Sequence, residues 1–411
     1  MRQLFLLVIL IIVICHGQLS IANARTRKGP PVIIIPGTGA SIIEAEVKRA
    51  SDDGSGCPRH KDWFRAWLNV KEMFPTRLPC LINDLRLTFD PETNISSAPA
   101  GTRTRVVGFG TASSVEYMDH SWLAYFLFNI GTNAAALIKR LLHLGYERDV
   151  SIRGAPYDFR FSMGSDVNYF QRLKLLVEET YHLNGDSPVS LISHSMGGLY
   201  SVWFLNQQTK EWKDKFIDSC ITVSAPWGGS AASLLSVTSG YNLHINFVDP
   251  LVVRKAQVTY ESTYLMLPSP LIWSKPLVYT DDRNYTMTAN DVSDMLETLR
   301  GSSQLYRHVM EINSLTRPSV MPPHPGVPTF CLHGAGISTE NELHFEGRNF
   351  ADEQPKVVFT DGDGTVSRES LSACNQWQGD TVHVQKEGVT HGAMWLTERG
   401  VDEILNALFR K

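Results

Sequence analysis

The chain reads Ser193-His194-Ser195-Met196-Gly197 between a short apolar run, residues 189–192, and an amphipathic run, residues 198–208. A small residue, His, Ser, any residue and Gly between a strand and a helix is the pattern of a nucleophile elbow. The turn is so tight that the serine is forced into a strained backbone conformation, and only small residues fit two positions before and after it. Taken alone, the pentapeptide also fits an ordinary glycine-containing turn, so its interpretation depends on the rest of the chain.

Strand-like and helix-like segments alternate on both sides of this motif. Residues 32–35 are a continuous apolar, β-branched run closed by Pro36-Gly37, which is typical of a buried strand in a parallel sheet. The other expected strands are 150–152, 189–192, 220–223, 328–332, 357–359 and 381–385, and the expected helices are 123–144, 169–183, 198–208 and 397–409. This order predicts right-handed βαβ crossovers, a mainly parallel sheet and an α/β fold.

The alternation is lost between residues 230 and 323. This insertion follows a central strand and contains two proline clusters, several aromatic residues and one glycosylation sequon. A long insertion at this point of such a sheet is the usual position of a cap or lid. We therefore expect residues 230–323 to form a cap or lid.

Residues 1–24 have the features of a secretory signal peptide. Arg2 precedes an apolar run, residues 4–15, and Ala22-Asn23-Ala24 is a small-x-small cleavage site. The run is too short for a bilayer-spanning helix with these flanks, although an uncleaved anchor is the alternative. We expect removal after Ala24, leaving a secreted or vesicular protein of residues 25–411, with N-glycosylation sequons at Asn94 and Asn284.

Export into an oxidising compartment determines how the cysteines are interpreted. Cys57, Cys80, Cys220, Cys331 and Cys374 remain after the signal, an odd number, so at least one thiol is free. We pair Cys57 with Cys80 and Cys331 with Cys374, and we expect Cys220, inside a strand-like run, to be a buried inert thiol.

Composition excludes one large class of function. The chain has 411 residues, of which 43% are hydrophobic and 19% charged, as in a globular protein. A net charge of -4 and the lack of a basic stripe argue against nucleic acid as a partner.

The segment from Cys57 to Cys80 breaks the α/β alternation and is rich in aromatic residues. Trp63, Trp67 and Val70 recur at helical spacing, which could mean a stripe that packs on the body of the protein. The other interpretation is a disulfide-stapled hairpin, over residues 55–82, that presents Trp63, Trp67 and Leu68 to a lipid surface. The sequence favours neither.

A serine nucleophile needs a base that takes its proton and an acid that orients the base. In this type of fold the acid and then the base follow the nucleophile along the chain, each at the end of a later strand. Asp363 follows the strand-like residues 357–359, and His391 follows residues 381–385. The sequence therefore predicts a triad of Ser195, Asp363 and His391.

Other residues compete for the acid and base roles. Asp361 lies in the same Asp-Gly-Asp-Gly segment, but the later residue of this loop usually reaches the histidine, so we assign Asp361 to the turn. The segment lacks the further oxygen ligands and the distal Glu of an EF-hand, and we expect no metal site. The side chain of His194 should point away from that of Ser195, whereas His333 and His383 are other candidates, with His383 inside a strand.

Two backbone N–H groups should form an oxyanion hole. The first belongs to Met196, directly after the nucleophile at the start of a helix, where the helix dipole also favours negative charge. The second should come from the loop after the first strand, residues 37–41, and Thr38 is the best candidate.

The chain resembles the lysosomal phospholipase A2 family (group XV) and, more distantly, lecithin–cholesterol acyltransferase. The resemblance runs from about Pro31 to the C-terminus. It is carried by residues 36–37 with 44–45, 82–87, 153–160, 194–197, 212–215, 225–229 and 362–366.

The resemblance implies an α/β-hydrolase core, a membrane-binding subdomain that includes the Cys57–Cys80 loop, and a lid or cap. It implies the triad, the oxyanion donors and both disulfides named above. It also implies phospholipase activity on glycerophospholipids and acyl transfer to lipophilic alcohols such as ceramide, without calcium or another cofactor, at acidic pH. We expect a monomer, lysosomal or secreted, that acts at the surface of a phospholipid membrane.

The oxyanion loop departs from the lysosomal enzyme. Thr38 stands where that enzyme has an acidic residue, and Gly39-Ala40-Ser41 replace the expected Leu-Gly-Asn. This difference leaves the pH optimum open. The alternatives are a secreted sterol acyltransferase, a neutral lipase and a catalytically inactive lipid-transfer protein, the last of which the intact triad argues against.

Overall fold

The computed structural model describes residues 29–50, 56–119, 121, 132–245, 247–281, 285–299, 302–313, 321–347, 350 and 353–410. The expected signal peptide, residues 1–24, and the sequon at Asn284 lie outside the described residues. Asn94, in the other sequon, is exposed between the short strands β4 (Thr88–Asp90) and β5 (Ile95–Ser97). Within the described ranges, no helix is both long and apolar enough to cross a membrane.

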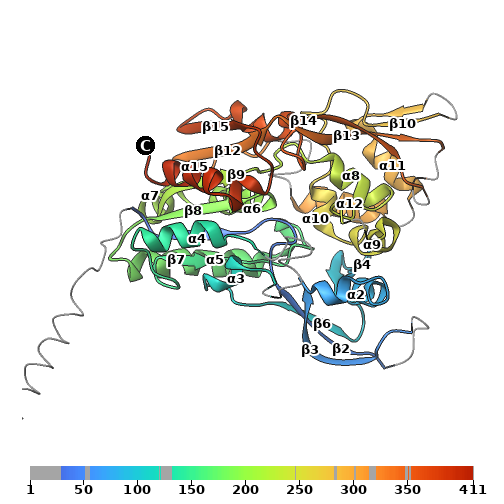
Figure 1. Cartoon of the computed structure of the whole chain (residues 1–411), viewed down its shortest axis with the longest axis horizontal. Coiled ribbons are helices and arrows are strands. Elements are labelled where there is room, and N and C mark those ends of the chain that lie inside the picture. The colour runs from blue at the N-terminus through green and yellow to red at the C-terminus, as the bar shows by residue number, and fades with distance from the viewer. Residues whose placement is uncertain are drawn as a thin grey trace, which may run out of the picture.

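A six-stranded sheet forms the centre of the molecule (Figure 1). All its neighbouring strands are parallel, in the order β15-β12-β9-β8-β1-β7, which confirms the predicted parallel sheet. Its strands are β1 (Val32–Ile35), β7 (Ile152–Gly154), β8 (Val189–His194), β9 (Ile217–Val223), β12 (Thr329–Ala335) and β15 (Thr381–Glu387). Ile35 pairs with Ser193, so the loop after β1 begins beside the elbow.

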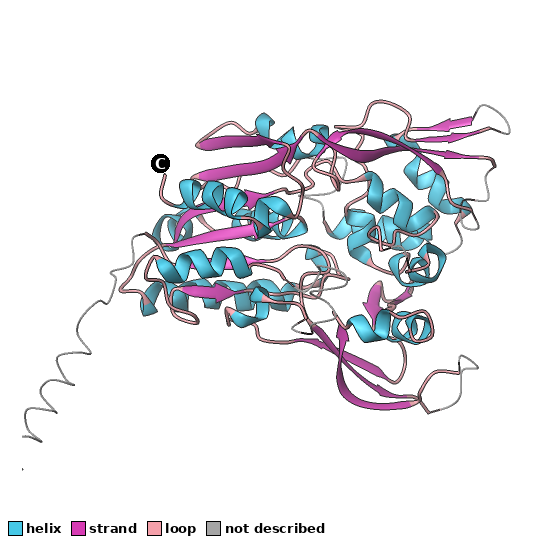
Figure 2. Cartoon of the chain, viewed as in Figure 1, coloured by secondary structure: helices cyan, strands magenta, loops and turns pink. Residues whose placement is uncertain are grey.

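Helices cover both faces of this sheet (Figure 2). Successive side chains of a strand point to opposite faces, and β1 shows why its whole run is apolar. Val32 and Ile34 pack with α4 and α15, whereas Ile33 and Ile35 belong to the core on the opposite face. The long helices of these layers are α4 (Ala135–His143), α15 (Glu398–Leu408), α5 (Val167–Leu183), α6 (Met196–Asn206) and α7 (Lys210–Phe216). Shorter pieces are α3 (Ser113–Glu116), η3 (Met163–Ser165), α13 (Arg368–Leu371), η5 (Ser372–Gln376) and α14 (Ala393–Leu396).

The Cys57–Cys80 segment belongs to a separate three-stranded antiparallel sheet, in the order β3-β2-β6. The strands of this sheet are β2 (Ile43–Lys48), β3 (His60–Trp67) and β6 (Thr102–Val106). Two helices follow β3, η1 (Val70–Met73) and α2 (Leu78–Leu85). The predicted helical stripe is wrong, because Trp63 and Trp67 lie on β3. The pairing of β3 with β2 contains two register shifts. Such irregularities interrupt the period-two alternation of a strand, so aromatic spacing of three or four does not identify a helix here.

The insertion after β9 folds beside the end of the central sheet (Figure 1). It contains α8 (Ala231–Thr238), α9 (Pro250–Gln257), α10 (Glu261–Leu265), β10 (Val278–Thr280), β11 (Tyr285–Met287), η4 (Ala289–Asp291), α11 (Val292–Thr298) and α12 (Ser302–Ile312). Its two strands join β13 (Ile337–Phe345) and β14 (Lys356–Gly362) in a second sheet of order β11-β10-β13-β14.

The sequence placed residues 357–359 in the central sheet, and this is wrong. They belong to β14, which pairs antiparallel with β13, a strand that the sequence analysis did not anticipate. The two strands form a hairpin that runs out from β12 toward the insertion and returns (Figure 1). The return strand brings Asp363 back to the central sheet, so the residue ends near its expected place by another route.

Both expected disulfides are present, Cys57–Cys80 and Cys331–Cys374. Cys220 on β9 is a buried free thiol. Burial raises the pKa of the Cys220 thiol to about 12, which keeps it protonated and poorly reactive.

Candidate active site

Ser195 occupies a strained turn between β8 and α6. Its backbone has φ 53° and ψ −129°, a conformation that a non-glycine residue adopts only under constraint. The Ser195 N–H donates to the carbonyl of Val223 over 2.8 Å, which fixes the turn to β9. A Cβ added to Gly197 would lie 2.4 Å from the carbonyl oxygen of Pro36, so only glycine fits there. The predicted nucleophile elbow is therefore present.

His391 and Asp363 meet at the C-terminal edge of the central sheet. His391 Nδ1 and Asp363 Oδ2 are 2.8 Å apart, and the Asp363 side chain is completely buried. Asp363 Oδ1 accepts hydrogen bonds from the N–H groups of Thr365 and Val366. Burial alone would raise the pKa of Asp363, but the adjacent His391 and these amide donors outweigh it and lower that pKa. Asp363 is therefore a carboxylate that can orient His391.

Asp361 has different partners, as the sequence suggested. Its Oδ1 accepts the N–H of Gly336 over 2.7 Å, and its Oδ2 pairs with the guanidinium of Arg368 over 2.7 Å. Asp361 thus holds the turn between β12 and β13 and does not contact His391.

His194 lies behind His391. Its Nε2 is 3.2 Å from the carbonyl oxygen of His391, and its ring stacks on Trp395 with centroids 5.1 Å apart. Burial, followed by the neighbouring His391, lowers the pKa of His194 to about 3. His194 is therefore a neutral donor that supports the His391 backbone. Trp395 was not anticipated, because nothing in its local sequence indicates this contact.

The lowered pKa of His194 predicts a loss of stability in acid. The unfolded state binds a proton near pH 6.5 and the folded state only near pH 3, so the contribution is complete above 6.5 and declines as pH falls toward 3. Between pH 7 and pH 5 it should remove about 2 kcal/mol from the free energy of unfolding. Denaturant unfolding of the wild type and of His194→Gln at both pH values measures it. Equal pH dependence in the two proteins would contradict the neutral buried state of His194.

The other two histidines that were candidates for the base, His333 and His383, are away from the nucleophile. His333 is buried on β12 and bonds through Nδ1 to the carbonyl of Gly334. His383 lies on β15 with Nδ1 3.7 Å from Cys374 Sγ. Within the described residues, Cys331, Cys374 and His383 are the one group with metal-ligand spacing, and the disulfide already uses both sulfurs. They therefore do not form a metal site.

The loop after β1 lies against the nucleophile, since a Cβ added to Gly37 would be 2.8 Å from the Cβ of Ser195. Ala40 N–H donates to the Gly37 carbonyl over 3.1 Å and closes a tight turn. Within the described residues, the N–H groups of Thr38 and Met196 donate to no protein acceptor. Among the residues that the structure describes, the Thr38 hydroxyl hydrogen-bonds to weak acceptors, the sulfurs of Met196 at 3.4 Å and Met266 at 3.7 Å. Two free donors next to Ser195 are what an oxyanion hole requires.

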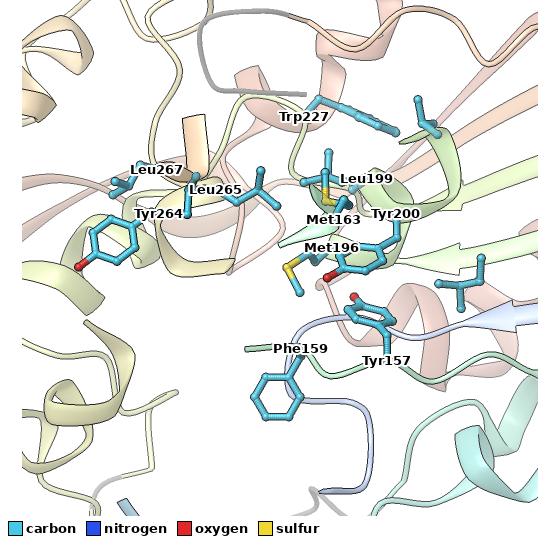
Figure 3. Packing of buried hydrophobic residues seen from close by; sticks show 14 of the residues in the cluster. Tyr157, Phe159, Met163, Met196, Leu199, Tyr200, Trp227, Tyr264, Leu265 and Leu267 are labelled. Carbon is cyan, nitrogen blue, oxygen red and sulfur yellow. The ribbon is translucent and has the colours of Figure 1, made fainter. Parts of the chain in front are cut away.

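A cavity of about 430 Å³ opens onto Ser195 and His391. It lies between α2 on one side and α8 and α9 of the insertion on the other, and its lining is mostly apolar. Representative lining residues are Leu81, Leu85, Phe159, Val253, Tyr260 and Met266. Figure 3 shows part of the packed core next to the site, where Met196 lies beside the stacked rings of Tyr157 and Tyr200; of its labelled residues, Phe159 also lines the cavity. A water-poor pocket of this size suits a hydrocarbon chain.

The structure contradicts the expected membrane contact of Leu68 and partly buries Trp63 and Trp67. Leu68 is 5% exposed and belongs to the core. Trp67 lines the cavity, and its Nε1–H donates to the carbonyl of Gly39 over 2.7 Å. Trp63 is half-buried and packs under the guanidinium of Arg105, 4.1 Å from the ring centre. Large apolar side chains are exposed instead at Leu243 and Leu396, which line the cavity, and at Phe74, which follows the lining residue Met73. We call these three residues the rim.

Comparison with known proteins shows the family to which the chain belongs. Residues 63–315 and 294–402 match the sequence model of a family described as Lecithin:cholesterol acyltransferase. The chain belongs to the lecithin:cholesterol acyltransferase family. It is 35% identical over 360 residues to the Rattus norvegicus lysosomal phospholipase A and acyltransferase, which covers 87% of this chain and 84% of that protein. It is 32% identical over 389 residues to the Homo sapiens phosphatidylcholine-sterol acyltransferase, covering 93% and 86%.

The fold is also that of a solved structure. A chain in the crystal structure of the Tle4–Tli4 complex aligns with a TM-score of 0.54 at 13% identity, over 94% of this chain and 99% of that chain. The fold is an α/β hydrolase. With family and fold together, this member of the lecithin:cholesterol acyltransferase family is a serine-type acyl ester hydrolase and acyltransferase that acts on lipids.

Proposed function

We propose that the protein is a phospholipase A and lipid transacylase that uses Ser195, His391 and Asp363. The observation that carries the proposal is the elbow serine at the floor of an apolar cavity, with the His391–Asp363 pair beside it. The relatives named lysosomal phospholipase A and acyltransferase support the same activity. A phospholipid supplies the acyl chain that the cavity would hold.

In the first half-reaction, His391 takes the proton of Ser195 as the serine oxygen attacks the ester carbonyl. The resulting oxyanion accepts hydrogen bonds from the Thr38 and Met196 amides. The carbon–oxygen bond to the glycerol then breaks as His391 protonates the leaving alcohol, which leaves an acyl-serine. In the second half, His391 activates water or a lipid alcohol, and the acyl chain moves to that oxygen.

The second substrate that we propose is a lipophilic alcohol such as ceramide, which can reach the acyl-serine from the same apolar mouth. We also propose that the reaction is independent of calcium. Asp363 is occupied by His391 and two amides, and Asp361 by Arg368 and Gly336, so this acidic segment has no spare carboxylate for a cation.

The test is a pH series of phospholipid vesicle deacylation, with and without ceramide and with a calcium chelator in every sample. We expect free fatty acid in the absence of ceramide, and acylceramide at the expense of fatty acid in its presence. Ser195→Ala protein supplies the background. A protein that cleaves triglyceride but leaves phospholipid intact at every pH would be a neutral lipase, and the proposal would be wrong.

A sterol acyltransferase is the second candidate, because the chain is 32% identical to the human phosphatidylcholine-sterol acyltransferase. Cholesterol and ceramide offered together as acceptors distinguish the two. Preferential formation of cholesteryl ester would favour this candidate.

We further propose residues 1–24 as a signal peptide, residues 55–82 as part of a membrane-binding subdomain and residues 230–323 as a cap. The proposed location is the lysosome or the extracellular space, with the protein a monomer bound peripherally to lipid. The names of the lysosomal relatives support the lysosome.

The rim should make the contact with the lipid surface. Phe74 is 41% exposed, and its ring is tilted by 32° against that of Phe247, with ring centres 6.0 Å apart. Phe74→Ser should weaken binding to phosphatidylcholine vesicles about tenfold, because about 1.4 kcal/mol of apolar burial in the bilayer is lost. Turnover of a soluble short-chain ester should not change.

The matched control is Leu175→Ser, an exposed apolar residue on α5, away from the cavity. Co-sedimentation with vesicles measures both variants. If Leu175→Ser weakens binding as much as Phe74→Ser, the rim is not the contact surface.

A further inference from the structure

Side chains from two different parts of the fold hold the backbone of the oxyanion loop. The Gly39 carbonyl accepts the indole N–H of Trp67 over 2.7 Å, and the Ala40 carbonyl accepts the Asn133 side-chain amide over 3.1 Å. The Gly37 carbonyl accepts Ala40 N–H within the loop. Each of these three neighbouring carbonyls therefore accepts a hydrogen bond that fixes its direction.

Each of these two side chains is itself held in place. Trp67 is the last residue of β3, and its ring lies 5.8 Å from that of Phe159. A Cβ added to Gly39 would be 3.5 Å from the Trp67 ring, so the indole lies directly against the loop. Asn133 is 5% exposed, and its Oδ1 accepts the indole N–H of Trp395 over 3.1 Å.

The loop needs such external support. Gly39 has φ +72°, a conformation that glycine adopts easily but that it also leaves easily. Because the C=O and N–H of one peptide unit point in opposite directions, the direction of the Gly37 carbonyl sets the direction of the Thr38 N–H. That carbonyl direction depends on Ala40 N–H, and the position of Ala40 depends on the neighbouring peptides that Trp67 and Asn133 hold. Oxyanion donors lower the barrier only when they are already oriented before the charge develops.

We infer that Trp67 is a positioning residue for the oxyanion loop, with Asn133 as its counterpart on the other side. The inference rests on the catalytic function proposed above, and it assigns Trp67 to catalysis on every ester and not to lipid contact. It also gives the β3-β2-β6 sheet a role in the chemical step, since the strand that carries Trp67 ends at the loop.

Trp67→Phe removes the indole donor and keeps an aromatic ring. On a soluble p-nitrophenyl butyrate, kcat should fall about ten- to a hundredfold with little change in KM, because a misplaced donor weakens the transition state and not substrate binding. Vesicle binding should stay as in the wild type. The rate at which a fluorophosphonate labels Ser195 should fall with kcat.

Trp212→Phe is the matched control. Trp212 lies on helix α7, at the opposite end of the central sheet from the site. Its indole N–H also donates over 2.7 Å, to Oε1 of Glu178 on α5. This variant should lose a comparable amount of thermal stability and keep its kcat. Asn133→Asp is the second arm, because the carboxylate can still accept from Trp395 but cannot donate to Ala40; it should reproduce the kcat loss of Trp67→Phe.

Three results would overturn the inference. The first is Trp67→Phe with full kcat on the soluble ester and weaker vesicle binding, which would make Trp67 a lipid contact. The second is a kcat loss in Trp212→Phe as large as in Trp67→Phe. The third, which covers a Trp67→Phe protein that does not fold, is Asn133→Asp with wild-type kcat. Failure of the proposed function is seen separately in the wild-type protein, either as no labelling of Ser195 by the fluorophosphonate or as labelling without phospholipid turnover.

Discussion

Replacing Ser195 with alanine is expected to abolish both deacylation and transacylation, with kcat lower by at least about 10⁴-fold. The substitution removes the only atom that can form the acyl-serine and keeps the Cβ that the elbow already accommodates. The oxyanion amides and the cavity remain, so a small residual rate above the uncatalysed reaction should persist. Phospholipid and soluble-ester turnover, together with fluorophosphonate labelling, measure the effect.

Ser224→Ala is a matched control for this variant. Ser224 follows β9, has a positive φ of 54° like Ser195, and its buried hydroxyl finds no hydrogen-bond partner among the described residues. Removing that hydroxyl should therefore leave turnover unchanged. Full phospholipase activity in Ser195→Ala would show that the nucleophile lies elsewhere.

The second large effect is expected for Asp363→Asn, with kcat lower by about 10⁴-fold. The asparagine amide can donate to His391 Nδ1 where Asp363 accepts from it now. His391 would then carry its proton on Nε2, the nitrogen that must be free to take the proton of Ser195. Substrate binding should change little, so the loss should appear in kcat and in the rate of fluorophosphonate labelling.

Asp361→Asn distinguishes this effect from a general disturbance of the loop. Asp361 is two residues away and holds Gly336 and Arg368, but it does not touch His391. This variant should lose about 1 kcal/mol of stability through the weakened ion pair and should keep its turnover. A larger loss of kcat in Asp361→Asn than in Asp363→Asn would reverse the assignment of the acid.

Asp363 and His194 should respond to acid over different pH ranges. The pKa of Asp363 is lowered from its ordinary value. The stability that its carboxylate contributes is therefore complete above the ordinary pKa of an aspartate, and it is lost as pH falls through the lowered pKa. Loss of folded protein at mildly acidic pH should instead follow His194. Activity and stability can therefore be separated by measuring both in His194→Gln.

Much of the site could be predicted from short sequence patterns. The elbow at Ser195 is local, because neighbouring small residues and strand–helix order define it. Asp363 and His391 were found because each lies just past a strand-like run, and this holds although β14 pairs with β13 and not with the central sheet. The position of a residue at a strand end is visible in the sequence, whereas the sheet to which the strand belongs is not.

The roles of Trp67, Asn133 and Trp395 could not be predicted in this way. Trp67 looked like one member of an aromatic stripe, whereas the structure places it at the end of β3 with its indole against Gly39. Asn133 and Trp395 are 262 positions apart in the chain, and their hydrogen bond depends on how α4 and α14 pack. No local pattern encodes contacts over such separations.

Export and the cysteine positions were enough to predict the two disulfides. Local patterns and chain order were enough to predict the α/β class, the parallel central sheet and the three residues of the proposed triad. These follow from periodicity, turn chemistry and chain order, which are properties of neighbouring residues. Only the folded chain shows which carbonyls of the oxyanion loop are held, which apolar residues form the rim and which tryptophans line the cavity. These depend on pairing register and on packing between distant segments, where a shift of one residue turns a side chain from the surface to the interior.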